Sequence, residues 1–377
     1  MKVEIVRPFA FLDISIGGKP KGRIVVELFD DLAPNATTNF FNLVDKSKTP
    51  NFVGNYFHRV VKNFVIQAGD VVNCIPDKDY GTDVGKGNIS TINEGEPFGI
   101  ENGEEIDGPF KLCTANNDPN ANGSQFFITT YPSKHLTGKH SVFGAVKHGK
   151  SVVREIERVS TNDDNVPKPN EKVVIEDCGV WDESMDIPIY NACYDPIGGD
   201  IYEEYPDDDE NIDKESSESV YNASVIMKDS GSQLLKLGRL QDALFKYTKC
   251  LRYVMEYIPD DEQEPQWYVK YYDLKKKLYL NMSLVNLQLK DYKRAIDFSD
   301  YLLDMNNLNN QDKGKGYYRR GMAELSLNKY ELAVKDFTEA VKYVPNDKNI
   351  QLQLEKSEKL RDQKKMDEKA KYAKFFK

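Results

Sequence analysis

Two sets of side chains in this sequence have types and spacing that could do chemistry. In the first half, the segments 56–70 and 115–144 are ordered runs that combine a guanidinium, several amides, histidines and aromatic rings. In the second half, Lys315 and Arg319 lie four residues apart, which places both on one face of a helix. Both sets offer hydrogen-bonding groups, and the first adds apolar surface, so they suit non-covalent binding of a ligand.

The cysteines predict no further site. They are odd in number, scattered and without a C-x-x-C pair: Cys74, Cys113, Cys178, Cys193 and Cys250. This argues against a disulfide framework and a zinc site, so we expect no cofactor and a reducing compartment. The first residues lack a secretory apolar core and no run is long enough to span a membrane, which predicts a soluble, cytoplasmic protein with no membrane partner.

Length and charge indicate more than one domain. The chain has 377 residues, which is more than one hydrophobic core usually supports. Its formal charge of −10 disfavours a nucleic-acid partner. Residues 1–180 carry 20 basic and 24 acidic side chains (−4), residues 181–220 carry 1 and 14 (−13), and residues 221–377 carry 30 and 23 (+7). The last part is therefore electropositive and suits an acidic partner.

Composition divides the chain in the same places. Up to about residue 180, short runs of β-branched and aromatic residues between turn residues predict a mostly β domain, with one helix over 34–43. Residues 182–220 are acidic and poor in large apolar groups, so we expect a solvated linker. Helical periodicity then continues to the end, where the Lys-rich segment 347–377 is expected to form a capping helix.

A self-alignment reveals internal repeats in the helical part. A polar turn, a bulky residue and an alanine recur at Ala243, Ala295 and Ala333, which are 52 and 38 residues apart. The period is that of a helix-pair repeat of about 34 residues, with an insertion in the first connection. The pattern resembles the tetratricopeptide repeat, with three copies over 221–346. Its core positions are Gly231 and Tyr247 in the first copy and Gly321 and Phe337 in the third, whereas the second is degenerate, with Ser283 and Ser299.

In tetratricopeptide domains of this type, five places on the first helices of the repeats form a carboxylate clamp. The matching residues are Lys228, Ser232, Asn281, Lys315 and Arg319, with Ser232 standing where the family usually has asparagine. The resemblance implies binding of the Glu-Glu-Val-Asp tail of cytosolic heat-shock protein 90, with the 70-kDa chaperone as a further partner. Such binding needs donors that converge in a groove, which cations and an amide provide.

The segments 56–70, 115–128 and 135–144 look like the signatures of the cyclophilins. The resemblance spans most of residues 8–180 and, together with the repeats, is to the large tetratricopeptide-containing cyclophilins. It implies a multidomain chain: a closed eight-stranded β-barrel with capping helices over 1–181, the acidic linker, and an all-α repeat domain. It also implies peptidyl-prolyl cis-trans isomerase activity on proline-containing client proteins.

Isomerisation about an X-Pro bond must overcome a barrier of about 18–20 kcal/mol. By resemblance, Arg59 lowers it by hydrogen bonding to the prolyl nitrogen, whose lone pair is available only when amide resonance is broken. The resemblance assigns an apolar proline pocket to Phe64, Val65, Phe127 and Leu136, and the flanking peptide to Gln67, Gln125, Ala115 and the Asn116 backbone. His140 and His135 would line the pocket, while His58 is interpreted as structural because no proton transfer is required.

The sequence departs from the family at several of these places. Val65 replaces the usual Met, and Asn117 replaces the usual Ala. His135 stands where small cyclophilins have Trp, and because of this change we expect weak cyclosporin binding. The segment 71–109 matches least, and residues 85–88 read Gly-Lys-Gly-Asn in place of Gly-Thr-Gly-Gly. Two hypotheses remain open: an isomerase of reduced activity that acts as a co-chaperone, or a chaperone adaptor whose barrel binds peptides with little or no catalysis.

Overall fold

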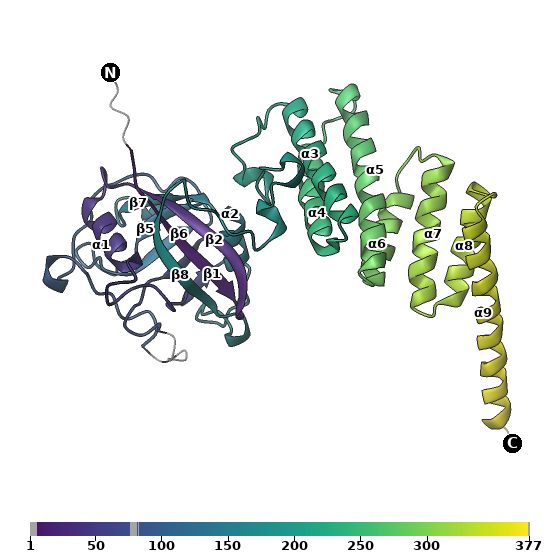
Figure 1. Ribbon diagram of the computed structural model, residues 1–377, viewed down its shortest axis with the longest axis horizontal. Coiled ribbons are helices and arrows are strands. Elements are labelled where there is room, and N and C mark those ends of the chain that lie inside the picture. The colour runs from purple at the N-terminus through teal and green to yellow at the C-terminus, as the bar shows by residue number, and fades with distance from the viewer. Residues whose placement is uncertain (1–5, 76–80, 82, 376–377) are drawn as a thin grey trace. The chain divides into compact units, whose positions relative to one another are not determined.

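The computed structural model in Figure 1 describes residues 6–75, 81 and 83–375. The residues 76–80 of the poorly matching segment and the first five residues therefore lie outside the described part. The chain divides into two compact units, Met1–Asn191 and Ala192–Lys377. No helix of the described part is both long and apolar enough to cross a membrane.

The first unit is built on one antiparallel sheet of eight strands in the order β3-β4-β6-β5-β7-β2-β1-β8. The segment 54–57, which leads into β3, hydrogen bonds to β8 through Gly54 N to Ile175 O and Phe57 N to Val173 O. The two ends of the sheet therefore meet, which confirms the predicted closed barrel. The strands are β1 Phe9–Ile16, β2 Lys19–Leu28, β3 Arg59–Val61, β4 Val65–Ala68, β5 Lys111–Thr114, β6 Phe126–Thr129, β7 Val142–His148 and β8 Val173–Trp181.

Two α-helices of the described residues cover the barrel. Helix α1 (Pro34–Val44) begins with a proline, which suits a first helical turn, and packs on β1, β7 and β8. Helix α2 (Lys150–Glu157) packs on β2, β3 and β4. The predicted helix over 34–43 is thus confirmed, and its buried Phe40 meets the ring of Phe126 on β6 at 5.5 Å. Short 3-10 turns occupy Asn93–Gly95, Lys134–Leu136 and Pro169–Glu171.

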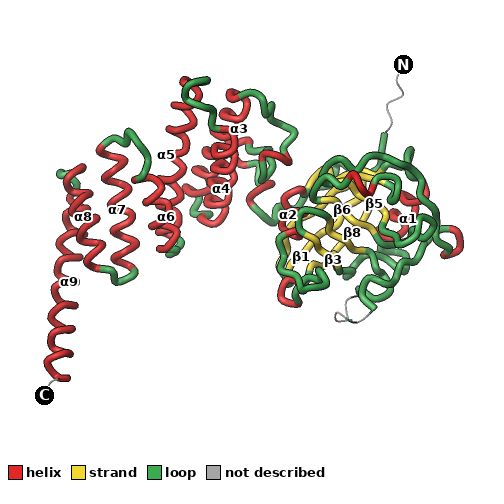
Figure 2. Tube along the Cα trace, turned by 180° about the vertical axis from the view of Figure 1, so that it is seen from behind, coloured by secondary structure: helices red, strands yellow, loops and turns green. Residues whose placement is uncertain are grey.

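The second unit begins inside the acidic segment. Figure 2 shows this segment as loop and short helical turns, which are Ala192–Tyr194, Ile197–Gly199 and Pro206–Asp208. These turns contact α3 (Ser217–Lys236) and α4 (Leu240–Tyr257), and Ile197 and Tyr202 pack against the buried core of the helices. The prediction of a solvated linker is therefore wrong from residue 192 onward, because this part of the segment has a surface of its own unit to pack on.

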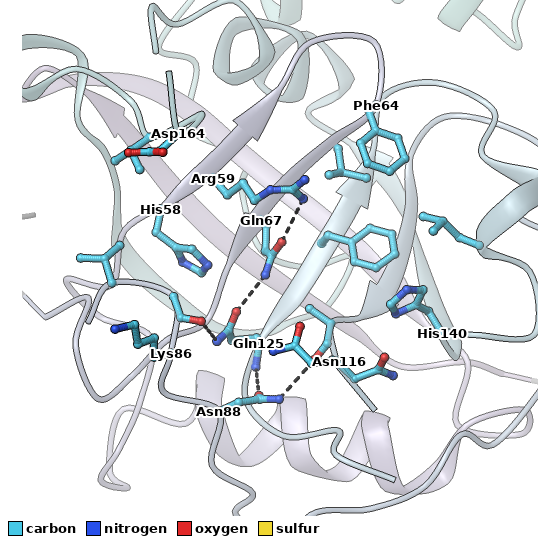
Figure 3. A pocket seen from close by; sticks show the side chains of 18 of the residues that line it. His58, Arg59, Phe64, Gln67, Lys86, Asn88, Asn116, Gln125, His140 and Asp164 are labelled. Carbon is cyan, nitrogen blue, oxygen red and sulfur yellow. Dashed lines mark hydrogen bonds between the residues drawn. The ribbon is translucent and has the colours of Figure 1, made fainter. Parts of the chain in front are cut away.

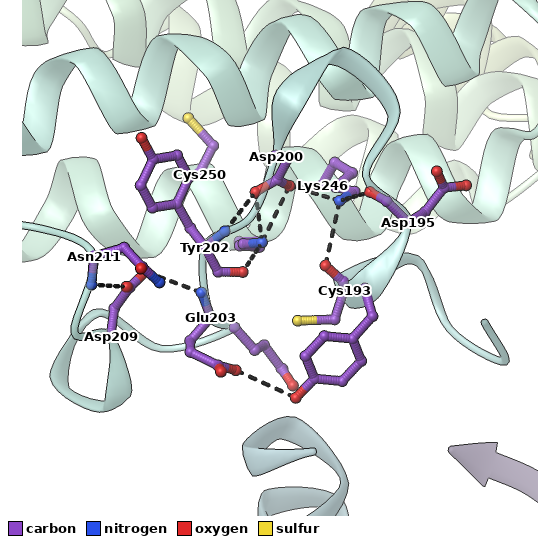
Figure 4. Close-up of polar contacts among 12 residues, drawn as sticks. Cys193, Asp195, Asp200, Tyr202, Glu203, Asp209, Asn211, Lys246 and Cys250 are labelled. Carbon is purple, nitrogen blue, oxygen red and sulfur yellow. Dashed lines mark hydrogen bonds and ion pairs between the residues drawn. The ribbon is translucent and has the colours of Figure 1, made fainter. Parts of the chain in front are cut away.

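Buried ion pairs hold the acidic segment in place. The Asp200 carboxylate accepts hydrogen bonds from Lys246 Nζ at 2.6 Å and Lys249 Nζ at 2.8 Å, and all three side chains are fully buried (Figure 4). Lys246 Nζ also donates to the Asp195 carbonyl at 2.8 Å. Burial, together with the neighbouring Lys249 cation, lowers the pKa of Lys246. The acidic residues that led us to predict a solvated linker thus include Asp200, whose carboxylate pairs with two cations of α4.

The remaining helices form antiparallel neighbours as the repeats predict. Helix α3 packs with α4, α5 with α6 and α7 with α8, and α9 follows on α8. The bulky residue of each repeated turn, Leu240, Tyr292 or Tyr330, is the first residue of α4, α6 or α8. The bounds not yet given are α5 Pro265–Gln288, α6 Tyr292–Leu303, α7 Asn310–Ser326, α8 Tyr330–Tyr343 and α9 Lys348–Phe375.

Small residues let the paired helices approach each other. The three repeated alanines are fully buried. A Cβ atom at Gly231 would meet the Tyr247 ring at 2.8 Å, and one at Gly321 would meet the Phe337 ring at 3.0 Å. Each glycine therefore leaves room for the aromatic ring of the partner helix, and these positions serve packing rather than chemistry.

Candidate functional site

A cleft with a volume of about 740 Å³ lies on the barrel (Figure 3). Ten of the eleven side chains predicted for the isomerase site line it: Arg59, Phe64, Val65, Gln67, Ala115, Asn116, Gln125, Phe127, Leu136 and His140. Asn117, noted as a departure from the family, also lines it. The sheet brings together residues that lie up to about eighty positions apart in the chain.

Strand register explains how the centre of the cleft is assembled. Arg59 on β3 lies opposite Gln67 on β4, and Gln67 lies opposite Phe127 on β6. Side chains of directly paired residues point to the same face of a sheet, so these three form one row across three strands. Val65 lies two residues before Gln67 and shares that face.

A chain of hydrogen bonds runs along the polar side of the cleft. Arg59 Nη1 donates to Gln67 Oε1 at 3.5 Å, and Gln67 Nε2 donates to Gln125 Oε1 at 2.8 Å. The first of these bonds is long, and no ion pair of Arg59 occurs within the described residues. Most of the guanidinium donors therefore remain available to a ligand in the cleft.

The opposite side of the cleft is apolar. Val65 and Phe127 are 2% and 4% exposed and pack in one buried cluster with Cys113 and Ala115, against which Leu136 also packs. These side chains are held by the sheet, so the surface they form is present before a ligand binds.

His140 closes the apolar side. Its ring meets Phe127 edge to face at 5.1 Å, and its Nδ1 lies 3.0 Å from the Thr114 carbonyl oxygen. A carbonyl only accepts, so Nδ1 carries the proton and Nε2 is left as an acceptor. Burial lowers the pKa of His140, which keeps the imidazole neutral at pH 7.

His58 also lines the cleft, next to Arg59, and is 4% exposed. Neither ring nitrogen makes a hydrogen bond of good geometry among the described residues, although Gln125 lies close enough to interact with the ring. Burial outweighs the opposing charge of Asp70 and lowers the pKa of His58 to about 4. The ring is thus neutral at pH 7, as expected where no proton is transferred.

His135 is the predicted site residue that the structure does not place in the cleft. It lies in the 3-10 turn Lys134–Leu136, is exposed, and stacks on the ring of Phe64 at 5.5 Å. The turn directs Leu136, but not His135, into the lining. Its contact with Phe64 nevertheless fixes one edge of the cleft.

The loop that matched the family least forms one wall of the cleft. Gly85 N and Gly87 N donate to the fully buried Asp70 carboxylate at 2.8 and 3.1 Å. Gln125 Nε2 donates to the carbonyls of the same two glycines at 2.9 and 2.8 Å. The altered sequence is therefore held firmly against the barrel. Further lining residues that the sequence analysis did not predict include Lys86, Asn88 and Asp164.

The five residues predicted for the carboxylate clamp lie on three helices that contact one another in the order α3, α5, α7. Lys315 is exposed, Asn281 is half-buried, and Lys228 forms an ion pair with Asp229. The Ser232 hydroxyl donates to the Lys228 carbonyl at 2.9 Å and accepts from Tyr247 at 3.2 Å.

Arg319 differs from the other cations of the clamp. Its guanidinium donates to the Leu280 carbonyl and, at 3.2 Å, to the Ser283 hydroxyl. No carboxylate pairs with it within the described part of the chain, and burial lowers its pKa to about 10. It remains charged at pH 7 without a counter-ion of its own.

Nothing in the described residues gathers three or more His, Cys, Asp or Glu side chains as a metal site. All five cysteines are buried.

Comparison with known proteins agrees with this geometry. A family model described as cyclophilin type peptidyl-prolyl cis-trans isomerase/CLD matches residues 11–180, and a tetratricopeptide repeat model matches residues 314–347. The chain is 42% identical to "Peptidyl-prolyl cis-trans isomerase CYP7" of Saccharomyces cerevisiae, over 98% of this chain and 99% of that protein.

Two further relatives carry the name "Peptidyl-prolyl cis-trans isomerase D". The protein from Kluyveromyces lactis is 40% identical and that from Eremothecium gossypii 36% identical, in each case over 91% of this chain and 92% of the relative. The similarity covers both units in each comparison. The chain belongs to the cyclophilin-type peptidyl-prolyl cis-trans isomerases that carry tetratricopeptide repeats.

Proposed function

We propose that this isomerase acts as a cytoplasmic co-chaperone: the barrel isomerises X-Pro bonds of client proteins while the repeats dock on the C-terminal tail of heat-shock protein 90. The barrel part rests on one observation, which is a guanidinium with free donors beside a preformed apolar surface. The ring of a proline residue needs the apolar surface, and the nitrogen of its amide needs the guanidinium donors.

In this proposal Arg59 stabilises the twisted amide. The prolyl ring lies on Phe127, Val65 and Leu136, and the Arg59 guanidinium donates to the prolyl nitrogen once resonance is broken. Because the planar amide offers no such lone pair, the bond forms in the transition state and not in the ground state. Gln67, held by Gln125, keeps the Arg59 side chain at the ligand.

A protease-coupled isomerisation assay on the full chain tests the barrel. We expect Arg59→Ala to lower kcat/KM roughly ten- to a hundredfold, because a charge-assisted hydrogen bond contributes about 1.5–3 kcal/mol. Arg7→Ala is the matched control, since Arg7 pairs with Asp31 outside the cleft. If the wild type is no faster than Arg59→Ala, catalysis fails as an explanation and the adaptor hypothesis replaces it.

The docking part rests on Arg319, a half-buried cation with no carboxylate partner among the described residues, on the side of α7 that also carries Lys315. A C-terminal aspartate supplies two carboxylates, which suit Arg319 and Lys315 as charge-assisted partners. The same chemistry serves the tails of heat-shock protein 90 and of the 70-kDa chaperone, and both lie in the cytoplasm.

Titration of a peptide that ends in Glu-Glu-Val-Asp tests the docking. We expect Lys315→Ala and Arg319→Ala each to weaken binding at least tenfold, because each removes a charge-assisted contact. Lys335→Ala removes an equal charge from the exposed face of α8 and is the control. Binding by both variants as tight as by the wild type, or equal binding of the peptide with an amidated C-terminus, contradicts the clamp.

A further inference from the structure

The side chain of Asn88 makes three hydrogen bonds within the wall of the cleft. Its Nδ2 donates to the Ala121 carbonyl at 2.9 Å and to the Ala115 carbonyl at 3.2 Å. Its Oδ1 accepts from Gln125 N at 2.8 Å (Figure 3). Because the amide meets two carbonyls and one N–H, only this orientation of the group satisfies all three.

These bonds join three separate pieces of the cleft. Ala115 directly follows β5, Gln125 directly precedes β6, and Ala121 lies in the loop between them. Ala115 N also donates to the Gln125 carbonyl at 3.0 Å, so Asn88 continues the pairing of the two strands beyond their ends. Ala115 and Gln125 both line the cleft.

The chain is built to admit this side chain. A Cβ atom at Gly123 would lie 2.8 Å from the Asn88 backbone oxygen and 2.8 Å from its Oδ1. Any other residue at Gly123 would push Asn88 away from the wall. Asn88 itself stands at a position where the sequence departs from the glycine of the family pattern.

Gln125 connects Asn88 to the polar row of the cleft. Its main-chain N–H is held by Asn88, and its side chain accepts from Gln67, which in turn accepts from Arg59. On the other side, Asn88 holds the carbonyl of Ala115, next to Asn116, whose side chain bonds Asn122 Oδ1 at 2.8 Å. One amide therefore sets the spacing between the polar row and the edge that meets the peptide.

We propose that Asn88 is a positioning residue for the isomerase reaction, whose amide keeps the main chain of Ala115 and Asn116 at a fixed distance from the Gln125–Gln67–Arg59 row. This proposal rests on the isomerase activity of the cleft and is independent of the docking function. Asn88 acts through these neighbours, and none of its hydrogen bonds goes to Val65, Phe127 or Leu136, whose side chains form the apolar surface for the proline ring.

That separation determines the kinetic effect. The apolar surface supplies ground-state binding and stays intact when Asn88 is changed. Rotation about the X-Pro bond requires that one side of the bond is held while the other turns. The distance between the Ala115–Asn116 main chain and the Gln125–Gln67–Arg59 row therefore affects this step. Loss of Asn88 should therefore lower kcat and leave KM within about twofold of the wild type.

Two variants of the full chain distinguish the contribution of the Asn88 donor, Nδ2, from that of its acceptor, Oδ1. Asn88→Asp keeps an acceptor for Gln125 N–H and places carboxylate oxygen against two carbonyls, so we expect kcat to fall at least tenfold. Asn88→Gly removes all three bonds but leaves room for water, so we expect a fall of about threefold. Asn120→Asp introduces the same charge at an exposed position of the loop between β5 and β6, outside the cleft lining, and should match the wild type.

Amide hydrogen exchange at Gln125 gives a second readout that general destabilisation does not imitate. Protection of Gln125 N–H should persist in Asn88→Asp and fall in Asn88→Gly, while the amides of β1 and β2 exchange as in the wild type. Melting temperatures establish that each variant is folded at the assay temperature. If Asn88→Asp does not fold, the Asn88→Gly arm decides alone. A kcat equal to that of the wild type in a folded variant, or a change confined to KM, overturns the proposal.

Discussion

Two places in the helical unit hold cationic side chains wholly or partly away from water, and they differ in the groups that partner the cations. Lys246 and Lys249 are fully buried and share the carboxylate of Asp200, which comes from the acidic segment. Arg319 is half-buried against a carbonyl and a hydroxyl, with no carboxylate among the described residues. The two lysines thus share one carboxylate of the chain and also donate to carbonyls, whereas Arg319 has a charge that an external carboxylate can neutralise.

The presence or absence of a carboxylate partner indicates what a cation held away from water does in the protein. Removing ions from water costs several kcal/mol, and a partner compensates for this only when its geometry is good. Asp200 meets that condition with hydrogen bonds of 2.6 and 2.8 Å. A cation retained without such a partner suits a role beyond stability, so we propose a ligand for Arg319 and assign the two lysines to the fold.

The largest effect is expected from Asp200→Asn. This variant leaves two buried lysines without a counter-charge, and breaking a buried pair typically costs about 3–5 kcal/mol. Chemical denaturation, followed through the helical far-ultraviolet signal, measures the loss. Asp207→Asn is the control, because Asp207 is exposed in the same segment and should change the free energy of unfolding by less than about 0.5 kcal/mol. Equal effects of the two variants would mean that the segment is not anchored by Asp200.

A smaller effect on stability is expected from Arg319→Met. Methionine keeps the bulk of the side chain and removes a charge that has no internal counter-ion, so the free energy of unfolding should stay within about 1 kcal/mol of the wild type. Tail binding should still be lost, as for Arg319→Ala. Stability is followed by the same denaturation experiment. A loss as large as that of Asp200→Asn would show that Arg319 belongs to the fold and remove the contrast between the two places.

The smallest effect is expected from Ser232→Asn. The Ser232 hydroxyl is engaged with the Lys228 carbonyl and Tyr247, and its side chain is short. An asparagine extends further and restores the residue usual in the family, so we expect the tail peptide to bind about three- to tenfold more tightly, as measured by calorimetry. Ser326→Asn, on an exposed part of α7, is the control. Unchanged affinity would place residue 232 outside the clamp.

The barrel and the repeats could be predicted from the sequence because their signals are local or ordered. The helix over 34–43 follows a proline, and the repeated turns begin α4, α6 and α8 at the expected residues. The motif around Arg59 forms the two consecutive strands β3 and β4. The pairing of these strands places Gln67 beside Arg59 in the cleft. The exposed position of His135 could not be predicted. It lies in the 3-10 turn Lys134–Leu136, and the tertiary structure around this turn decides which of its side chains faces the cleft.

The acidic segment could not be predicted because its partners are remote. Asp200 pairs with Lys246 and Lys249, which lie 46 and 49 residues later in the chain. Composition gives the number of charges but does not show which of them pair. The position of Asn88 could not be predicted for the same reason. Its type was visible as a departure from the family, but the three groups that it joins come from different parts of the barrel.

The sequence by itself determined the family, the two kinds of fold, and ten of the eleven predicted cleft residues, since periodicity and ordered motifs are written along the chain. Only the tertiary structure decided which charges are paired, where the second unit begins, and how the altered loop is held. Those outcomes depend on burial, which raises the cost of an unpaired charge or amide and so selects partners that are distant in the chain.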